Sequence, residues 1–133
     1  MNSVTITEHL FEELRQRFCL FCDAVVDDVS INFAPEKKVI LVLAVKDNQA
    51  ESGWSKVVFE VHDFDEFKFC YGRHTFEVLS SGMQVFWKVG GVHLFLDAYP
   101  DDPEMPDTGS NFAYVVGKKL IYRDLQEPST TRG

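Results

Sequence analysis

One change in hydrophobic period divides this chain into a short helical part and a long series of strands. From about Thr5 to Cys22 the apolar residues recur at helical spacing and gather on one side of an α-helix. From Val29 almost to the end they instead alternate with polar residues, as on strands with one buried face. This order predicts an α+β fold, in which an N-terminal amphipathic helix packs on a curled antiparallel β-meander of about six to eight strands.

The helix is expected to begin at a capping box. In Thr5-Ile6-Thr7-Glu8 a threonine hydroxyl can accept a hydrogen bond from a free backbone N–H, and the Glu8 carboxylate can accept one from the cap residue. Most charged side chains of the segment fall outside its apolar face. That face is expected to comprise Leu10, Phe11, Leu14, Phe18, Phe21, Cys22 and Val25.

Two strand patterns follow the helix. The run Val39 to Val45 is apolar on both sides, which predicts a central strand covered on both faces. The alternation that begins at Trp54 predicts a hairpin turning at Phe64-Asp65-Glu66, in the register that keeps its aromatic side chains on one face. The expected pairs are Val61 with Phe69 and Phe59 with Tyr71.

Gly90-Gly91 gives the clearest turn signal, because glycine readily adopts the positive φ angles of a two-residue hairpin turn. Pairing outward from this turn yields one apolar face and one mixed face. The expected pairs are Val89–Val92, Trp87–Leu94, Val85–Leu96 and Met83–Ala98 on the apolar face, and Lys88–His93, Phe86–Phe95 and Gln84–Asp97 on the mixed face.

The mixed face and the acidic, proline-rich stretch after it are the expected partner-binding surface. Partly exposed aromatic rings can anchor a partner, and a run of carboxylates attracts a basic one. The spacing of a calcium-binding loop is absent from Tyr99 to Gly109. The predicted binding residues are Phe86, Lys88, His93, Phe95, Tyr99, Asp101, Asp102, Glu104 and Asp107.

Cys19 and Cys22 form the only two-cysteine motif, and their position argues against redox or metal chemistry. They are expected in the last turns of the helix, whose negative end opposes thiolate formation. No second pair of cysteines or histidines would complete a zinc site. Cys22 is therefore predicted to pack in the core, with no cofactor and no metal expected.

The sequence contains no strong signature of a catalytic site. The best available constellation is Cys70 with His62 and Glu60, which reads more simply as a solvated strand face. The sequence favours a protein that is not an enzyme.

Length and charge limit the remaining classes. The 133 residues predict one domain over 1–125 and a disordered tail over 126–133. A net charge of −8 without a basic cluster argues against nucleic acid as a partner. Neither a signal peptide nor a membrane-spanning apolar run is visible, and three cysteines fit a reducing compartment, so a cytoplasmic location is expected.

Two functional hypotheses remain. The first is a non-catalytic protein-binding or inhibitory module with a basic protein partner, or a homodimer. The alternative is a small-ligand-binding protein or enzyme that uses the concave face of the sheet, with Trp87, Tyr71, His93 or Tyr114 lining a pocket. In its acidic, aromatic-rich character the chain resembles the small immunity proteins that bacteria pair with secreted toxins. This resemblance covers no motif and implies a basic toxin as the partner.

Overall fold

The computed structural model describes residues 3–69, 78–96 and 113–125, which form one helix, one 3-10 turn and ten strands. No helix in these ranges is long and apolar enough to cross a membrane. In chain order the elements are β1 (Ser3–Thr5), α1 (Glu8–Arg17), η1 (Cys19–Phe21), β2 (Ala24–Asn32), β3 (Lys38–Lys46), β4 (Trp54–His62), β5 (Glu66–Phe69), β6 (Val78–Leu79), β7 (Met83–Lys88), β8 (Gly91–Leu96), β9 (Ala113–Gly117) and β10 (Lys119–Asp124).

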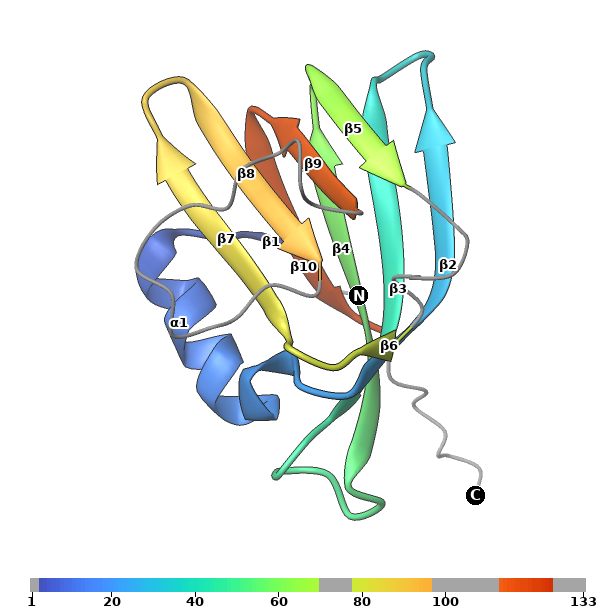
Figure 1. The fold of residues 1–133 in the computed structure, drawn as a ribbon, viewed down its shortest axis with the longest axis vertical. Coiled ribbons are helices and arrows are strands. Elements are labelled where there is room, and N and C mark those ends of the chain that lie inside the picture. Colours follow the sequence, from blue (N-terminus) through green and yellow to red (C-terminus); the bar gives the residue numbers. More distant parts are fainter. Residues whose placement is uncertain (1–2, 70–77, 97–112, 126–133) are drawn as a thin grey trace.

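The strands form two antiparallel sheets rather than one meander (Figure 1). The six-stranded sheet has the order β1-β10-β4-β3-β2-β6, and the four-stranded sheet has the order β5-β9-β8-β7. One hydrophobic core lies between them and takes side chains from both, such as Leu41 and Phe59 from one sheet and Leu94 and Val115 from the other. The α+β class is confirmed, whereas the arrangement and number of the strands differ from the prediction.

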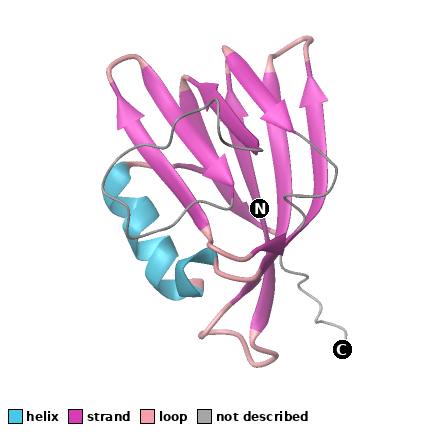
Figure 2. Cartoon of the chain, viewed as in Figure 1, coloured by secondary structure: helices cyan, strands magenta, loops and turns pink. Residues whose placement is uncertain are grey.

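The helix packs at one side of the two layers rather than over the outer face of either sheet (Figure 2). Its buried residue Phe11 reaches both sheets, with ring centroids 6.5 Å from Phe59 of β4 and 5.9 Å from Trp87 of β7. The aromatic residues of the predicted apolar face therefore close the side of the sandwich. Among the described residues, no helix covers the outer face of either sheet.

Both ends of α1 differ from the prediction. The N-cap is Thr7, whose Oγ1 accepts a hydrogen bond from the Leu10 N–H at 3.2 Å, while Thr5 belongs to β1. The helix ends at Arg17, and the next turn has positive φ angles of 56° at Cys19 and 61° at Leu20. Helical periodicity continues past this break because the core also receives the side chains of η1.

The hairpin predicted between β4 and β5 is wrong. Strand β4 lies between β3 and β10, and β5 pairs with β9 in the other sheet. Asp63, with a φ of 54°, follows β4, and the buried Phe64 leads the chain into the second layer. The expected partner Tyr71 lies outside the described residues.

The β7–β8 hairpin forms, but its register differs by two residues. Trp87 lies opposite Val92 and Phe86 opposite His93, because Val89 and Gly90 form the turn. Gly91 belongs to the ladder, where a Cβ would collide with the backbone oxygen of Gly117. A slip of two residues keeps the side chains of β7 and β8 on their predicted faces, although the pairs differ. Val89, predicted on the apolar face, is instead exposed in the turn, and the expected partners Asp97 and Ala98 lie outside the described residues.

Strand β3 is central in its sheet, as predicted, but its two faces are covered unequally. The inward residues Val39, Leu41 and Leu43 are fully buried, whereas the outward residues Ile40 and Val42 are half-buried. The outward side chains face no second layer of described residues.

Candidate functional site

The outer face of the four-stranded sheet brings most of the chemically distinctive residues together. The registers of β7 with β8, β8 with β9 and β9 with β5 align the outward positions in rows. We call this surface the aromatic face, and it consists of Glu66, Lys68, Gln84, Phe86, Lys88, His93, Phe95, Tyr114 and Val116.

Three rings cross the aromatic face in a chain. The Phe86 and Phe95 centroids lie 6.0 Å apart in a T-shaped arrangement, and the Phe95 and Tyr114 centroids also lie 6.0 Å apart. They form a second apolar cluster, separated from the main core by the sheet itself. Phe95 is fully buried and Tyr114 nearly so, while Phe86 is partly exposed. Phe86 can therefore contact a partner directly, whereas the buried Phe95 ring packs beside it on the same face.

The polar groups beside these rings are partly unpaired. The Tyr114 hydroxyl donates a hydrogen bond to Glu66 Oε2 at 2.6 Å. His93 Nδ1 is buried and has no hydrogen-bond partner within the described ranges. Burial and the nearby positive charge of Lys88 lower the pKa of His93, against the opposing effect of Glu66. The lowered pKa favours the neutral ring, and burial of a nitrogen that no described residue hydrogen-bonds costs free energy.

The predicted binding residues divide into two groups. The structure brings Phe86, Lys88, His93 and Phe95 together on the aromatic face, whereas Tyr99, Asp101, Asp102, Glu104 and Asp107 lie outside the described residues. The prediction missed Glu66 and Val116 and gave Tyr114 only as a possible pocket residue. Their outward positions follow from the pairing of β5 with β9, which the alternating pattern could not reveal.

The alternative site on the concave side is not assembled as expected. Trp87 points into the layer between the sheets, while His93 and Tyr114 lie on the opposite side of their sheet. The inner faces are filled by the core. Trp87 therefore shares no pocket with the other two residues.

The Glu60 and His62 pair is part of a larger charge network on the outer face of the six-stranded sheet. His62 Nε2 lies 2.8 Å from Glu60 Oε1, and Arg123 donates to Oε2 at 3.4 Å. Burial would raise the pKa of Glu60, but the hydrogen bond with His62 and the charges of Lys38 and Arg123 lower it overall. The carboxylate is well satisfied, which fits a structural role. Cys70, the third member of the predicted constellation, lies outside the described residues.

The two neighbouring cysteines are free thiols. Cys19 is exposed and lies in η1, while Cys22 follows η1 and is partly exposed. Both lie beyond the helix rather than in its last turns. Within the described ranges, no three cysteine, histidine or acidic side chains come together as a metal-binding group.

The fold and the site define a class of protein with two antiparallel sheets, one helix at their side and an aromatic outer face. No protein-family model, curated protein or solved structure matches the chain.

Proposed function

We propose that this protein is a non-catalytic protein-binding or inhibitory module whose contact surface is the aromatic face. The observation that carries the proposal is the Phe86–Phe95–Tyr114 chain of rings, an apolar cluster on the outer side of a sheet. A partly exposed aromatic ring held in place by buried neighbours is typical of the anchors that dominate protein interfaces. Rigid support also reduces the entropy lost when a partner binds.

Charge favours a basic partner. The segment 97–112 contains five acidic residues and no lysine or arginine. It connects β8 with β9, the two central strands beneath the aromatic face. An apolar centre beside charged groups matches the usual anatomy of an interface, and the carboxylates would accelerate encounter with a basic protein.

More specifically, we propose that the protein is an immunity protein, which neutralises a basic toxin in the cytoplasm. Its support is the general resemblance in size, acidity and aromatic content to small bacterial immunity proteins. Self-association through the aromatic face is the second possibility, since an apolar outer face can also bind its own copy.

The test uses affinity capture from the organism that supplies the sequence, with four variant baits. F86A removes the exposed anchor, and its control F33A removes a phenylalanine that is 66% exposed at the β2–β3 turn. The triple variant D101K/D102K/D107K reverses three charges of the acidic segment. Its control, E13K/D28K/E51K, reverses three exposed acids elsewhere on the molecule.

We expect the wild-type bait to enrich a basic protein. Both test variants should capture at least about tenfold less of it, because a central aromatic anchor contributes at least about 2 kcal/mol to binding. Both controls should retain it. Equal capture by all five baits would overturn the proposal. A concentration-dependent dimer that F86A abolishes, without any captured protein, would support self-association instead.

A further inference from the structure

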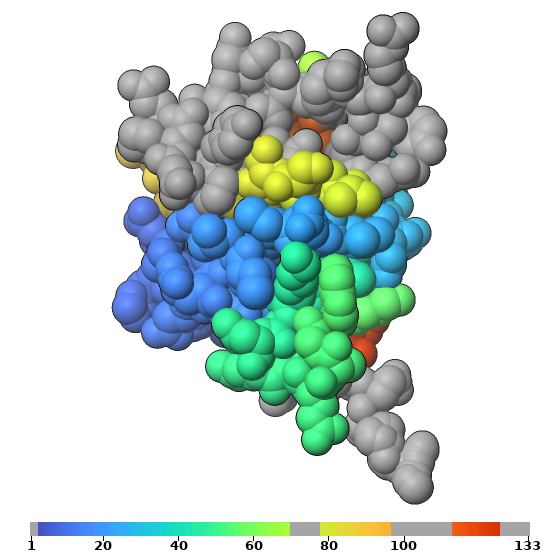
Figure 3. Space-filling model, turned by 60° about the horizontal axis from the view of Figure 1, so that its bottom comes forward, coloured from blue at the N-terminus to red at the C-terminus, as the bar shows by residue number. Residues whose placement is uncertain are grey.

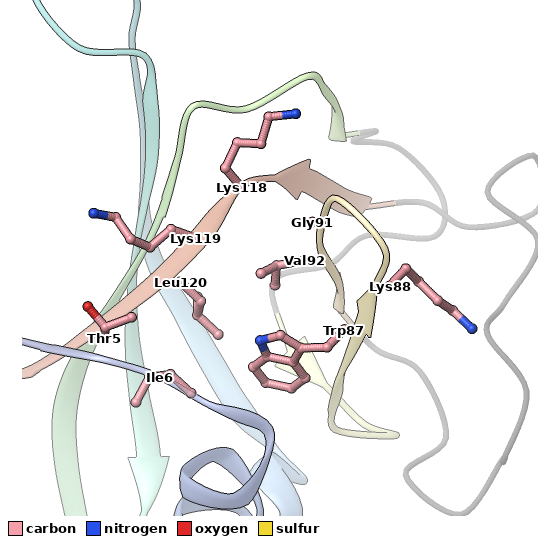
Figure 4. Close-up of a pocket in the computed structure, with 9 residues that line it drawn as sticks. All are labelled: Thr5, Ile6, Trp87, Lys88, Gly91, Val92, Lys118, Lys119 and Leu120. Carbon is pink, nitrogen blue, oxygen red and sulfur yellow. The ribbon is translucent and has the colours of Figure 1, made fainter.

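A pocket of about 330 Å³ opens where three connections meet: the corner between β1 and α1, the β7–β8 hairpin and the β9–β10 connection (Figure 4). The site lies at the side of the sandwich and is separate from the ring cluster of the aromatic face, with which it shares only Lys88. Two glycines allow close approaches beside it, because a Cβ on Gly91 would collide with the Gly117 backbone oxygen of β9, and a Cβ on Gly117 would collide with Val61 and His62 of β4.

The pocket wall is largely apolar, and its polar side-chain groups are the Trp87 indole N–H and the Thr5 hydroxyl. Ile6, Val92 and Leu120 are buried core residues that present their side chains to the pocket. The Trp87 ring extends between them, with its indole nitrogen on the edge toward Val92 and Leu120 (Figure 4). No hydrogen-bond partner of this N–H occurs among the described residues. The wall thus combines an apolar surface with the indole N–H of Trp87 and the hydroxyl of Thr5.

The pocket rim is entirely basic. Lys88, Lys118 and Lys119 line it, and no acidic residue of the described ranges does. Lys118 is 3.4 Å from Asp65, whereas Lys88 and Lys119 have no ion-pair partner in the described ranges. Their ammonium groups project outward from the rim, on flexible stems that are exposed and free to turn (Figure 4). Three lysines around one opening, of which only Lys118 has an acidic partner among the described residues, stand out in a chain whose net charge is −8.

We infer that this pocket binds a small amphipathic carboxylate, with its apolar body against Ile6, Val92, Leu120 and Trp87 and its carboxylate among the lysines. Pockets that bind small molecules commonly combine apolar walls with a few polar groups. At about 30 Å³ for each water-sized group, the volume accommodates roughly eleven non-hydrogen atoms. Octanoate has about this size, and the unused indole N–H gives its carboxylate a further donor.

The first arm of the test follows the fluorescence of Trp87 in a W54F background, which removes the only other tryptophan, itself 43% exposed. Octanoate is titrated beside octanol and octylammonium, which have the same chain but a neutral or positive head. We expect saturable binding of octanoate with a dissociation constant of about a millimolar or tighter. The other two compounds should bind at least about fivefold more weakly, because they lack the charge that the rim attracts.

The second arm tests the rim with K118Q/K119Q, which keeps Lys88 and so leaves the aromatic face intact. The matched control K46Q/K56Q removes two lysines that form ion pairs elsewhere with Asp23 and Asp27. Each exposed charge contributes roughly two- to fivefold to affinity, so the test variant should weaken octanoate binding about tenfold and the control by less than twofold.

Absence of saturable octanoate binding would overturn the inference, as would equal affinity for octylammonium or equal weakening by the two lysine pairs. None of these outcomes affects the proposed protein-binding function, because F86A and the acidic segment test a different surface.

Discussion

Asp47 should be the carboxyl that most strongly couples stability to pH. Its side chain is fully buried, and it joins the end of α1 to the β3–β4 loop, which lie side by side in Figure 3. Arg17 donates to both carboxylate oxygens, at 3.0 and 2.9 Å, and the Ser55 hydroxyl donates at 2.5 Å. The Gln49 backbone N–H adds a fourth hydrogen bond at 2.9 Å. The substitution D47N removes the charge and keeps the shape.

The magnitude follows from the pKa of Asp47. Burial alone would raise it, but hydrogen bonds from Arg17, Ser55 and the Gln49 N–H, with the Arg17 charge, lower it from 3.8 to about 2. Such a shift contributes about 2 kcal/mol of stability at neutral pH. D47N also leaves Arg17 without its carboxylate. Because Arg17 is 28% exposed, water offsets part of that loss, and we expect D47N to lower the free energy of unfolding by about 2–3 kcal/mol at pH 7.

The pH dependence gives a sharper test. Because folding lowers this pKa, the stabilisation is complete above the unfolded pKa near 4 and is lost as pH falls toward 2. Urea denaturation of wild type and D47N should therefore show a difference that is constant from pH 7 to 5 and shrinks steadily toward pH 2. D28N, a change at an exposed acid, is the control and should stay within about 0.5 kcal/mol of wild type. A difference that is negligible at pH 7, or independent of pH, would refute the reasoning.

Three further substitutions test the fold by denaturant unfolding. G91A should lower the free energy of unfolding by at least about 2 kcal/mol, because its Cβ meets a backbone carbonyl of β9. G90A should lower it by only about 1 kcal/mol, because its Cβ lies in open space and adds only the strain of a positive φ. Equal losses would contradict the close approach of β8 to β9. F11A should cost about 3–5 kcal/mol and F33A under about 1 kcal/mol, and similar losses would contradict the assigned burial. T7A should cost about 1 kcal/mol by removing the cap, and no change would argue against Thr7 as the N-cap.

The sequence could predict which way side chains point, but not which strands are neighbours. Alternation fixed the inner and outer residues of β7 and β8 correctly even though the register was displaced by two. The same alternation in β4 and β5 suggested a hairpin, while the structure places these strands in different sheets. The alternating pattern shows only which face of a strand is buried. Several different neighbouring strands are compatible with the same pattern. Asp63, where φ is positive, is a residue type that favours turns, but a turn signal does not tell whether the chain returns to the same sheet or enters the other one.

The small size of the helix explains why a binding surface is expected on the outer face of a sheet. A single helix of ten residues is about 15 Å long and can seal one side of two packed sheets, but not their outer faces. Those two faces differ in chemistry. The outer face of the six-stranded sheet has a buried carboxylate, Glu60, whose partners His62, Lys38 and Arg123 are all in place.

The aromatic face, in contrast, has a His93 nitrogen without a hydrogen-bond partner among the described residues, and a ring cluster that leaves Phe86 partly exposed. A face whose polar groups are already paired gains little from a partner, because binding would exchange existing bonds for new ones. A face with an exposed anchor can still gain free energy by losing contact with water. Of the two outer faces, the aromatic face is therefore the one on which a partner would gain most, which is why the substitution F86A decides the proposal.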